Sequence, residues 1–212
     1  MLINTCEGLV EYDKVAKLQP LIAKSYEVSP DGKTYTFHLR GDVYFHDDKC
    51  FPGGKGRKVT ASDFKYCYER VCDPRAKTRG LWVYRDKVEG AEEFAAAPDK
   101  VKGITGFIAQ DDSTFIIKLV QPFAPFLSIL TMPYGYVYPR EAVEMYKEDF
   151  GFRIVGTGPY KFVKWDVDKE LACEKNENYW AKDKQGSVLP KIDGFSVSFI
   201  RSPETEFLDF KE

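Results

Sequence analysis

One stretch of alternating side chains limits what this chain can fold into more than any other segment does. Residues 29–32 read Ser-Pro-Asp-Gly, a turn sequence in which proline fixes one φ angle and glycine accepts a positive one. Over residues 34–40 apolar and polar side chains then alternate, and the apolar members are Tyr35, Phe37 and Leu39. Because a strand has a period of two, these three side chains share one face. We expect a half-buried β-strand here, which resumes over residues 43–45 after a short break.

Further patterns add helices and strands around this one. Thr60 and Asp63 have the spacing of a capping box, and the apolar residues that follow recur at helical spacing: Phe64, Cys67, Tyr68 and Val71. A second hairpin is expected over residues 103–120, with its turn at residues 111–113. Strands are also expected over residues 2–12 and 191–200, and helices over residues 87–97, 122–130 and 140–146. These patterns predict a mixed α/β fold.

Composition argues against several classes of partner. Of the 212 residues, 43% are hydrophobic and 30% are charged, as in an ordinary soluble globular protein. The net charge of −2 gives no reason to expect a nucleic-acid partner or a charged membrane surface. No apolar run is long enough to span a bilayer, and no secretory signal precedes the first folded segment. We therefore expect that a targeting segment has been removed from this sequence.

The five cysteines leave two possibilities open. None of them forms a C-x-x-C pair, so a zinc or redox motif has no support. A disulfide between Cys50 and Cys72 is conceivable. The alternative is that all five remain free, half-buried thiols, because cysteine often packs as a small hydrophobic residue.

Patterns for catalysis and metal binding are weak. His46 lies beside Asp47 and Asp48, but adjacent residues in a strand point to opposite faces, so a solvated loop is favoured over a metal site. The glycines of residues 53–56 lack the spacing of a phosphate-binding loop, and we expect a flexible loop there. No nucleophile motif occurs. We predict no catalytic residue, no metal and no cofactor.

Several motifs, taken in order along the chain, resemble those of one known family. They are Glu7-Gly8-Leu9, Leu18 to Arg40, Phe45-His46-Asp47, Gly156 to Trp165 and Leu171 to Trp180. Together they resemble the extracytoplasmic solute-binding proteins of ABC transporters, family 5, the branch that binds oligopeptides, dipeptides or nickel. The polar loop over residues 47–58 departs from the tight turn that is usual in that family.

The resemblance implies an architecture and a division into lobes. It implies a fold like that of the type II periplasmic binding proteins, in which two lobes close around a solute by a hinge motion. Residues 1–40 and 153–200 would form the main lobe, and residues 41–152 an accessory subdomain. Residues 201–212 would begin a helix that leads to a second lobe beyond this sequence. Without that lobe we expect an exposed apolar patch or a dimer.

The resemblance also implies a function and candidate binding residues. The protein would capture a peptide or a similar solute outside the cytoplasm, as a periplasmic or lipid-anchored protein, and deliver it to a membrane permease. The candidate cleft residues are Glu7, Gly8, Leu9, Tyr134 and Tyr136. Glu7 would either face a ligand ammonium group or be a solvated or backbone-capping carboxylate, and the two tyrosines would line either the cleft or the core. Trp165 and Trp180 are assigned to the core.

Two other functions stay open at this stage. A sensor or interaction module could use the same fold without transport. A carboxylate-dependent hydrolase would need two carboxylates that converge in one pocket. We predict a binding protein rather than an enzyme.

Overall fold

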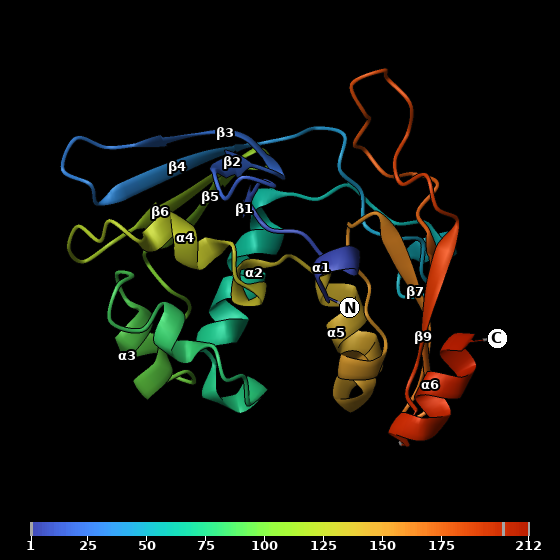
Figure 1. Cartoon of the computed structure of the whole chain (residues 1–212). Helices are drawn as coiled ribbons and strands as arrows, with labels where there is room; N and C mark the ends of the chain where they lie inside the picture. Colours follow the sequence, from blue (N-terminus) through green and yellow to red (C-terminus); the bar gives the residue numbers. More distant parts are fainter. Residues whose placement is uncertain (1, 201, 212) are drawn as a thin grey trace.

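The computed structural model describes residues 2–200 and 202–211, and within them the strands form three antiparallel sheets (Figure 1). The largest sheet has four strands in the order β3-β4-β6-β5. These strands are β3 (Ala23–Val28), β4 (Thr34–Leu39), β5 (Phe107–Asp111) and β6 (Thr114–Lys118). The strand predicted over residues 34–40 and the hairpin predicted over residues 103–120 are therefore confirmed, whereas the pairing of β4 with β3 across the turn at residues 29–32 was not predicted.

The alternation along β4 explains the core of this sheet. Tyr35, Phe37 and Leu39 are buried, whereas the residues between them are partly exposed. In the pairing of β4 with β6, Phe37 lies opposite Phe115 and Tyr35 lies opposite Ile117. Aromatic and β-branched cross-strand pairs of this kind stabilise a sheet.

Helix α2 (Ala61–Cys72) packs against the four-stranded sheet through the face that its spacing predicts. The capping box is formed, because Asp63 accepts a hydrogen bond from the backbone N–H of Thr60 at 2.8 Å. The Phe64 ring stacks on Phe115 with 6.0 Å between centroids. The Tyr68 ring meets Phe107 edge-on at 5.4 Å. These contacts place α2 and β5–β6 in one hydrophobic core.

The start of the chain differs from the expected strand. Residues Leu2–Thr5 form a short helix, α1, and only Val10–Tyr12 form a strand, β1, which pairs with β2 (Leu18–Pro20). Between α1 and β1 the backbone of Glu7 and Gly8 pairs with the connector around Tyr136. The strand expected over residues 2–12 is therefore wrong in its first part, because Leu2–Thr5 are helical and Gly8 makes only an isolated bridge before β1.

The strand expected over residues 43–45 is also absent. Phe45 N–H donates to Arg57, and Val43 accepts from Val59, so the hydrogen bonds of this segment go to the loop that follows it. Tyr44 makes one isolated bridge with Lys58 and no further ladder.

The remaining helices are short. They are α3 (Ala91–Ala96), α4 (Phe126–Leu130), α5 (Arg140–Tyr146) and α6 (Pro203–Lys211). Single 3-10 turns occur at Pro52–Gly54, Pro74–Ala76, Leu81–Val83, Pro133–Gly135 and Lys147–Phe152. Helix α3 begins later than predicted because Gly90 has a φ of +77°, which helical backbone does not adopt.

The third sheet lies on the other side of the molecule from β3–β6 (Figure 1). It contains β7 (Tyr160–Asp166), β8 (Glu170–Lys175) and β9 (Gly194–Ser198) in that order. The outer half of β7 is exposed, and Trp165 is 37% exposed, so its assignment to the core is wrong. Val197 of β9 and Phe199 beyond it are likewise exposed. Trp180 is half-buried and packs against the main core.

The four-stranded sheet crosses the lobe boundary that was predicted at residue 40. β3 and β4 precede that position, and β5 and β6 follow it, yet β4 pairs directly with β6 over residues 34–38. Residues 23–39 therefore share a sheet with residues 107–118.

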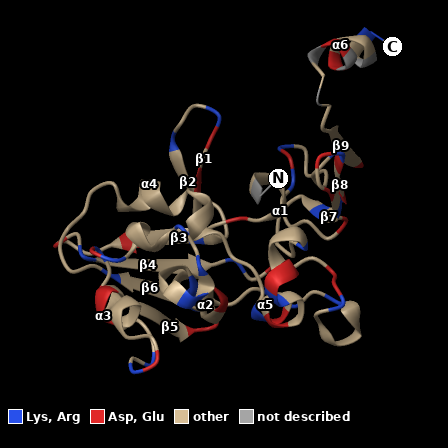
Figure 2. Ribbon diagram, turned by 90° about the horizontal axis from the view of Figure 1, so that it is seen from below, with Lys and Arg blue, Asp and Glu red and all other residues tan. Residues whose placement is uncertain are grey.

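Other expectations concern the thiols, the charges and the membrane. All five cysteines are free, which confirms the thiol alternative over a Cys50–Cys72 disulfide. Acidic and basic residues are interspersed along the ribbon rather than gathered by sign (Figure 2). Within residues 2–200 and 202–211, no helix is long and apolar enough to cross a membrane.

Candidate functional site

The carboxylate of Glu7 is buried and accepts hydrogen bonds from three residues near the other end of the chain. The hydroxyl of Thr157 donates to Oε2 at 2.9 Å, and that of Tyr179 donates to Oε1 at 2.8 Å. The indole Nε1 of Trp180 lies 3.3 and 3.2 Å from the two oxygens. We call these four residues the Glu7 cluster. Glu7 is only 4% exposed, so the solvated alternative for its carboxylate is wrong.

Burial dominates the electrostatics of Glu7. It raises the pKa of the carboxyl group from an ordinary 4.5 to about 7, although the hydrogen bonds from Tyr179, Thr157 and Trp180 act in the opposite direction. No cation forms an ion pair with Glu7 among those found in the described part of the chain. The group therefore changes its protonation state near neutral pH.

The backbone next to Glu7 joins the opening segment to the aromatic connector. The carbonyl of Glu7 accepts from Val137 N–H at 2.9 Å, and Gly8 forms an antiparallel bridge with Tyr136. A Cβ on Gly8 would lie 3.0 Å from the carbonyl oxygen of Gly135, which is tighter than nine in ten real Cβ contacts. The side chain of Leu9 is fully buried and belongs to the core.

A tight turn at Gly156–Pro159 meets the opening segment from the opposite direction. Gly158 N–H donates to the carbonyl of Thr5 at 3.0 Å. A Cβ on Gly156 would lie 1.9 Å from that same oxygen, so only glycine fits at this position. The opening segment and the block that begins at Gly156 are therefore in direct contact, as the resemblance requires.

His46 binds the same turn and is buried. Its backbone N–H donates to Gly156 O at 2.8 Å, and its Nε2 lies 2.9 Å from Gly158 O. Gly156 N–H donates to Nδ1 at 3.3 Å, which assigns the proton to Nε2. Desolvation lowers the pKa of His46 from 6.5 to about 4, so the ring is neutral at physiological pH. The expectation of a solvated loop histidine is wrong, because the turn at Gly156–Pro159 covers the ring.

Two neighbouring cavities lie at this side of the molecule, and Glu7 lines the first of them. One has a volume of about 310 Å³, and Glu7, Glu11, Tyr136 and Tyr179 are among its lining residues. The other is an apolar groove of about 600 Å³, whose lining residues include Ile3, Tyr136 and Trp165. Since Ile3, Cys6 and Tyr136 line both, the two cavities are adjacent.

The predicted site residues divide into two groups. Glu7 and Tyr136 line the first cavity, and Gly8 forms a backbone bridge with Tyr136, whereas Leu9 is buried in the core. Tyr134 instead packs edge-on against Trp82 at 6.3 Å, and its carbonyl accepts from the hydroxyl of Tyr84. A role of any of these residues in ligand binding stays a prediction.

Sequence reasoning missed the partners of Glu7. Thr157, Tyr179 and Trp180 belong to motifs that were noted only for their resemblance to a family, and Trp180 was assigned to the core. The available signal was the presence of hydrogen-bond donors in those motifs together with an acid in Glu7-Gly8-Leu9.

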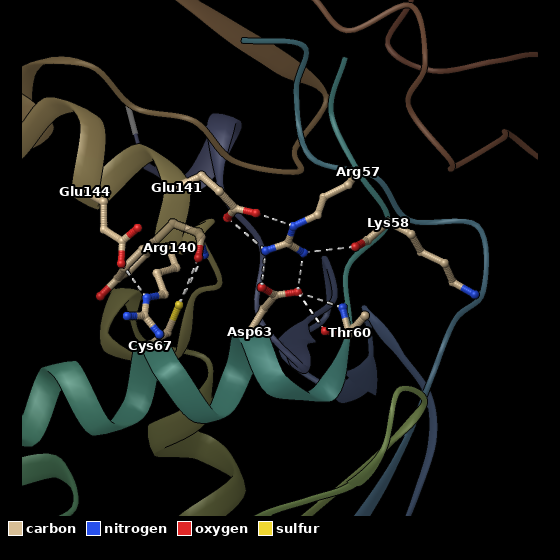
Figure 3. Close-up of polar contacts among 9 residues, drawn as sticks. Arg57, Lys58, Thr60, Asp63, Cys67, Arg140, Glu141 and Glu144 are labelled. Atoms are coloured by element: carbon tan, nitrogen blue, oxygen red, sulfur yellow. Dashed lines mark hydrogen bonds and ion pairs between the residues drawn. The ribbon is translucent and has the colours of Figure 1, made fainter. Parts of the chain in front are cut away.

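A second polar cluster anchors the polar loop of residues 47–58 (Figure 3). The guanidinium of Arg57 donates to Asp63 at 2.9 and 2.7 Å and to Glu141 at 2.6 and 2.9 Å. It therefore joins the loop to α2 and α5 at once. These bonds raise the pKa of Arg57 above its already high ordinary value, and they lower that of Glu141.

Metal-binding chemistry has no candidate in the part of the chain that the structure describes. No group of three or more His, Cys, Asp or Glu side chains among those residues could hold a metal ion. What the site offers is a partly aromatic cavity with a buried carboxylate on its wall.

Comparisons with known proteins agree on one family. Residues 17–212 match the family model of the bacterial extracellular solute-binding proteins, family 5. The chain is 34% identical over 192 residues to the glutathione-binding protein GsiB of Pectobacterium atrosepticum, covering 90% of this chain and 31% of that protein. It is 30% identical over 217 residues to the dipeptide-binding protein DppE of Bacillus subtilis, covering 99% of this chain and 36% of that protein.

Solved structures give the same result for the fold. The substrate-binding domain of an oligopeptide ABC transporter from Bacillus anthracis matches with a TM-score of 0.85 and 29% identity, over 99% of this chain and 38% of that one. Haemophilus influenzae OppA in complex with RPPGFSPFR matches with a TM-score of 0.80 and 29% identity, over 98% of this chain and 38% of that one. The fold is thus that of the oligopeptide-binding proteins, and the chain spans about a third of their length. This chain belongs to the bacterial extracellular solute-binding proteins of family 5.

Proposed function

We propose that the protein containing this chain captures a peptide or a related solute outside the cytoplasm and delivers it to the permease of an ABC importer. The observation that carries the proposal is the match of 98% of this chain to an oligopeptide-binding protein solved with a peptide. The relatives named for glutathione and for dipeptides support a small peptidic solute.

The cavity beside Glu7 is the part of this chain that we assign to the solute site. It is bordered by the opening segment, by the connector at Tyr136 and by the block that carries Tyr179. Aromatic side chains next to backbone segments suit an extended peptide, which is held by its main chain while its side chains pack in pockets. Tyr136 is the residue of this wall that we expect to contact the solute.

The lobe division is proposed in a revised form. We place residues 153–200 and the first residues of the chain in one lobe. The Thr5 carbonyl accepts from Gly158 N–H, and the Glu7 carboxylate accepts from the hydroxyl of Thr157. The pairing of β4 with β6 favours placing residues 23–39 in the accessory subdomain. We therefore move the first boundary from residue 40 to the junction at Glu7–Leu9.

The other two functions receive less support. A hydrolase would need a carboxylate that is free to act on a substrate, whereas both oxygens of Glu7 are engaged by Thr157, Tyr179 and Trp180. A sensor without transport would share the solute site and lack the permease, so only a transport measurement separates the two.

The test uses the longest gene product that contains these 212 residues, which we call the full-length protein. Equilibrium dialysis against a random-sequence pool of dipeptides to pentapeptides should recover bound peptides that mass spectrometry shows to be chemically unchanged. Absence of any bound peptide would contradict the proposal, and cleavage of the pool would favour the hydrolase. Uptake of a bound peptide by cells, lost on deletion of the gene, would separate transport from sensing.

A further inference from the structure

Glu7 connects three segments that border the first cavity. Its carboxylate binds Thr157 and Tyr179, and its backbone carbonyl binds Val137 in the connector. Its side chain thus contacts Thr157, which is 150 positions away in the sequence, and Tyr179, which is 172 positions away. One residue therefore joins the opening segment, the connector and the returning block.

The carboxylate of Glu7 has no oxygen left for a ligand. Oε1 accepts from Tyr179 and Trp180, and Oε2 accepts from Thr157 and Trp180. A solute ammonium group could reach either oxygen only by displacing one of these donors from a site that is 4% exposed. Displacement would leave a buried donor unsatisfied, which costs roughly 1–3 kcal/mol.

Two aromatic side chains of the cavity wall take their positions from Glu7. The hydroxyl of Tyr179 is fixed by its bond to Oε1. Tyr136 is held by its bridge to Gly8 and by the bond between Val137 N–H and the Glu7 carbonyl. Since both tyrosines line the cavity, a shift of Glu7 would change its shape.

We propose that Glu7 is a positioning residue for solute binding, which sets the placement of Tyr136 and Tyr179 across the cavity without touching the solute. The inference rests on the proposed function, because it takes this cavity to be part of the solute site. It decides between the two roles that the sequence left open for Glu7, in favour of an internal structural one.

Protonation of Glu7 should disturb this arrangement. A neutral carboxyl group carries a proton that must be donated, yet all its present partners are donors, so the hydroxyl of Thr157 or Tyr179 must rotate to accept. The titratable and charged groups around Glu7 are Cys6, Glu11, Tyr136, Tyr179 and, over the Trp180 ring at 4.3 Å, Arg40. Burial places the pKa of Glu7 at about 7, so solute affinity should vary between pH 5.5 and pH 8.

The test compares variants of the full-length protein in dialysis against the peptide pool, prepared once with free amino termini and once N-acetylated. Glu7→Ala and Tyr179→Phe should each lower the amount of bound peptide at least fivefold for both pools. Glu7→Gln, which replaces one acceptor oxygen by an NH2 donor as protonation does and cannot titrate, should bind at pH 8 as the wild type binds at pH 5.5 and should lose the change between the two pH values. Glu144→Gln, an exposed glutamate of α5 that is not among the lining residues of either cavity, is the matched control and should bind within twofold.

Two outcomes would contradict a positioning role of Glu7, and a third would contradict the proposed function. A tenfold loss for Glu7→Gln that is confined to peptides with free amino termini would show that Glu7 contacts the ligand, and would overturn the inference. Wild-type binding by Tyr179→Phe would also overturn it, even if Glu7→Ala fails to fold. If the wild-type protein binds neither pool, the proposed function itself fails, which is a distinct outcome.

Discussion

Glu7 and His46 hydrogen-bond to neighbouring residues of the same turn: Glu7 accepts from Thr157, and His46 bonds to Gly156 and Gly158. Both side chains are buried, and their pKa values are shifted in opposite directions, to about 7 for Glu7 and about 4 for His46. The turn that joins the opening segment to the returning block is thus held by an acid and a base whose uncharged forms are both favoured by burial.

These shifts predict compensating effects of pH on stability. Burial raises the pKa of Glu7 from 4.5 to about 7. The contribution of this shift to the free energy of unfolding is therefore complete below pH 4.5 and is lost as the pH rises through 7. Burial lowers the pKa of His46 from 6.5 to about 4. The contribution of this shift to the free energy of unfolding is therefore complete above pH 6.5 and is lost as the pH falls through 4. Between pH 4.5 and pH 6.5 the two nearly cancel.

Substituting Glu7 or His46 alone should reveal how the other residue makes the free energy of unfolding depend on pH. In Glu7→Gln the free energy of unfolding should fall by about 2 kcal/mol as the pH is lowered from 6.5 to 4.5, because only His46 then titrates. In His46→Gln it should fall by a similar amount as the pH is raised over the same range. Urea unfolding of the full-length protein at several pH values, with the double variant as control, measures both. Equal pH slopes in all four proteins would contradict the assignment of these two groups.

The close approach at Gly156 predicts a large cost for the smallest side chain. In Gly156→Ala the new Cβ would lie 1.9 Å from the Thr5 carbonyl oxygen and 2.8 Å from Cys6 Sγ, so the turn and the opening segment must separate. We expect a loss of roughly 3–5 kcal/mol in unfolding free energy. The matched control is Gly151→Ala, where no atom lies within 4 Å and the cost should be below about 0.5 kcal/mol. Similar unfolding midpoints for the two variants would show that the contact is not as close as described.

The free thiols predict a specific alkylation pattern. Burial raises the pKa of Cys6 and of Cys50 to about 12 and also raises that of Cys67, so little thiolate is present at pH 8. Iodoacetamide should therefore modify the cysteines of residues 1–212 slowly in the native protein. After unfolding without reductant it should modify all five of them. Mass spectrometry of peptides reports each site. A cross-linked peptide pair containing Cys50 and Cys72 would contradict the free-thiol state.

Local patterns predicted what depends on local spacing. The alternation of Tyr35, Phe37 and Leu39 predicted β4, and the capping box at Thr60 predicted the start of α2, because neighbours along the chain decide both. The Glu7 cluster could not be found in this way, since its hydrogen bonds join residues at least 150 positions apart.

The errors have the same physical origin. His46 was expected in solvent from its acidic neighbours, but a turn more than a hundred positions away covers it. Trp165 was expected in the core from its residue type, but it lies on the exposed outer half of β7, where Phe152 packs on it at 5.1 Å between ring centroids and leaves it 37% exposed. The lobe boundary is a different case: it stays a proposal, and its revised position draws on the pairing of β4 with β6, a contact that no local pattern contains.

The ion pairs of Arg57 should stabilise the fold more than the ion pair of Arg140 does, because only those of Arg57 include a buried carboxylate, that of Asp63. Asp63 is 5% exposed and loses its cation in Arg57→Met, although Thr60 still donates to it. Because the Arg57 side chain is itself 37% exposed, water replaces part of the interaction, and we expect a loss of about 2 kcal/mol in unfolding free energy. The control is Arg140→Met, whose pair with Glu144 is more than half exposed on both sides and should cost less than about 0.5 kcal/mol (Figure 3). Urea unfolding of both variants checks this difference, and equal costs would mean that the buried position of Asp63 does not matter.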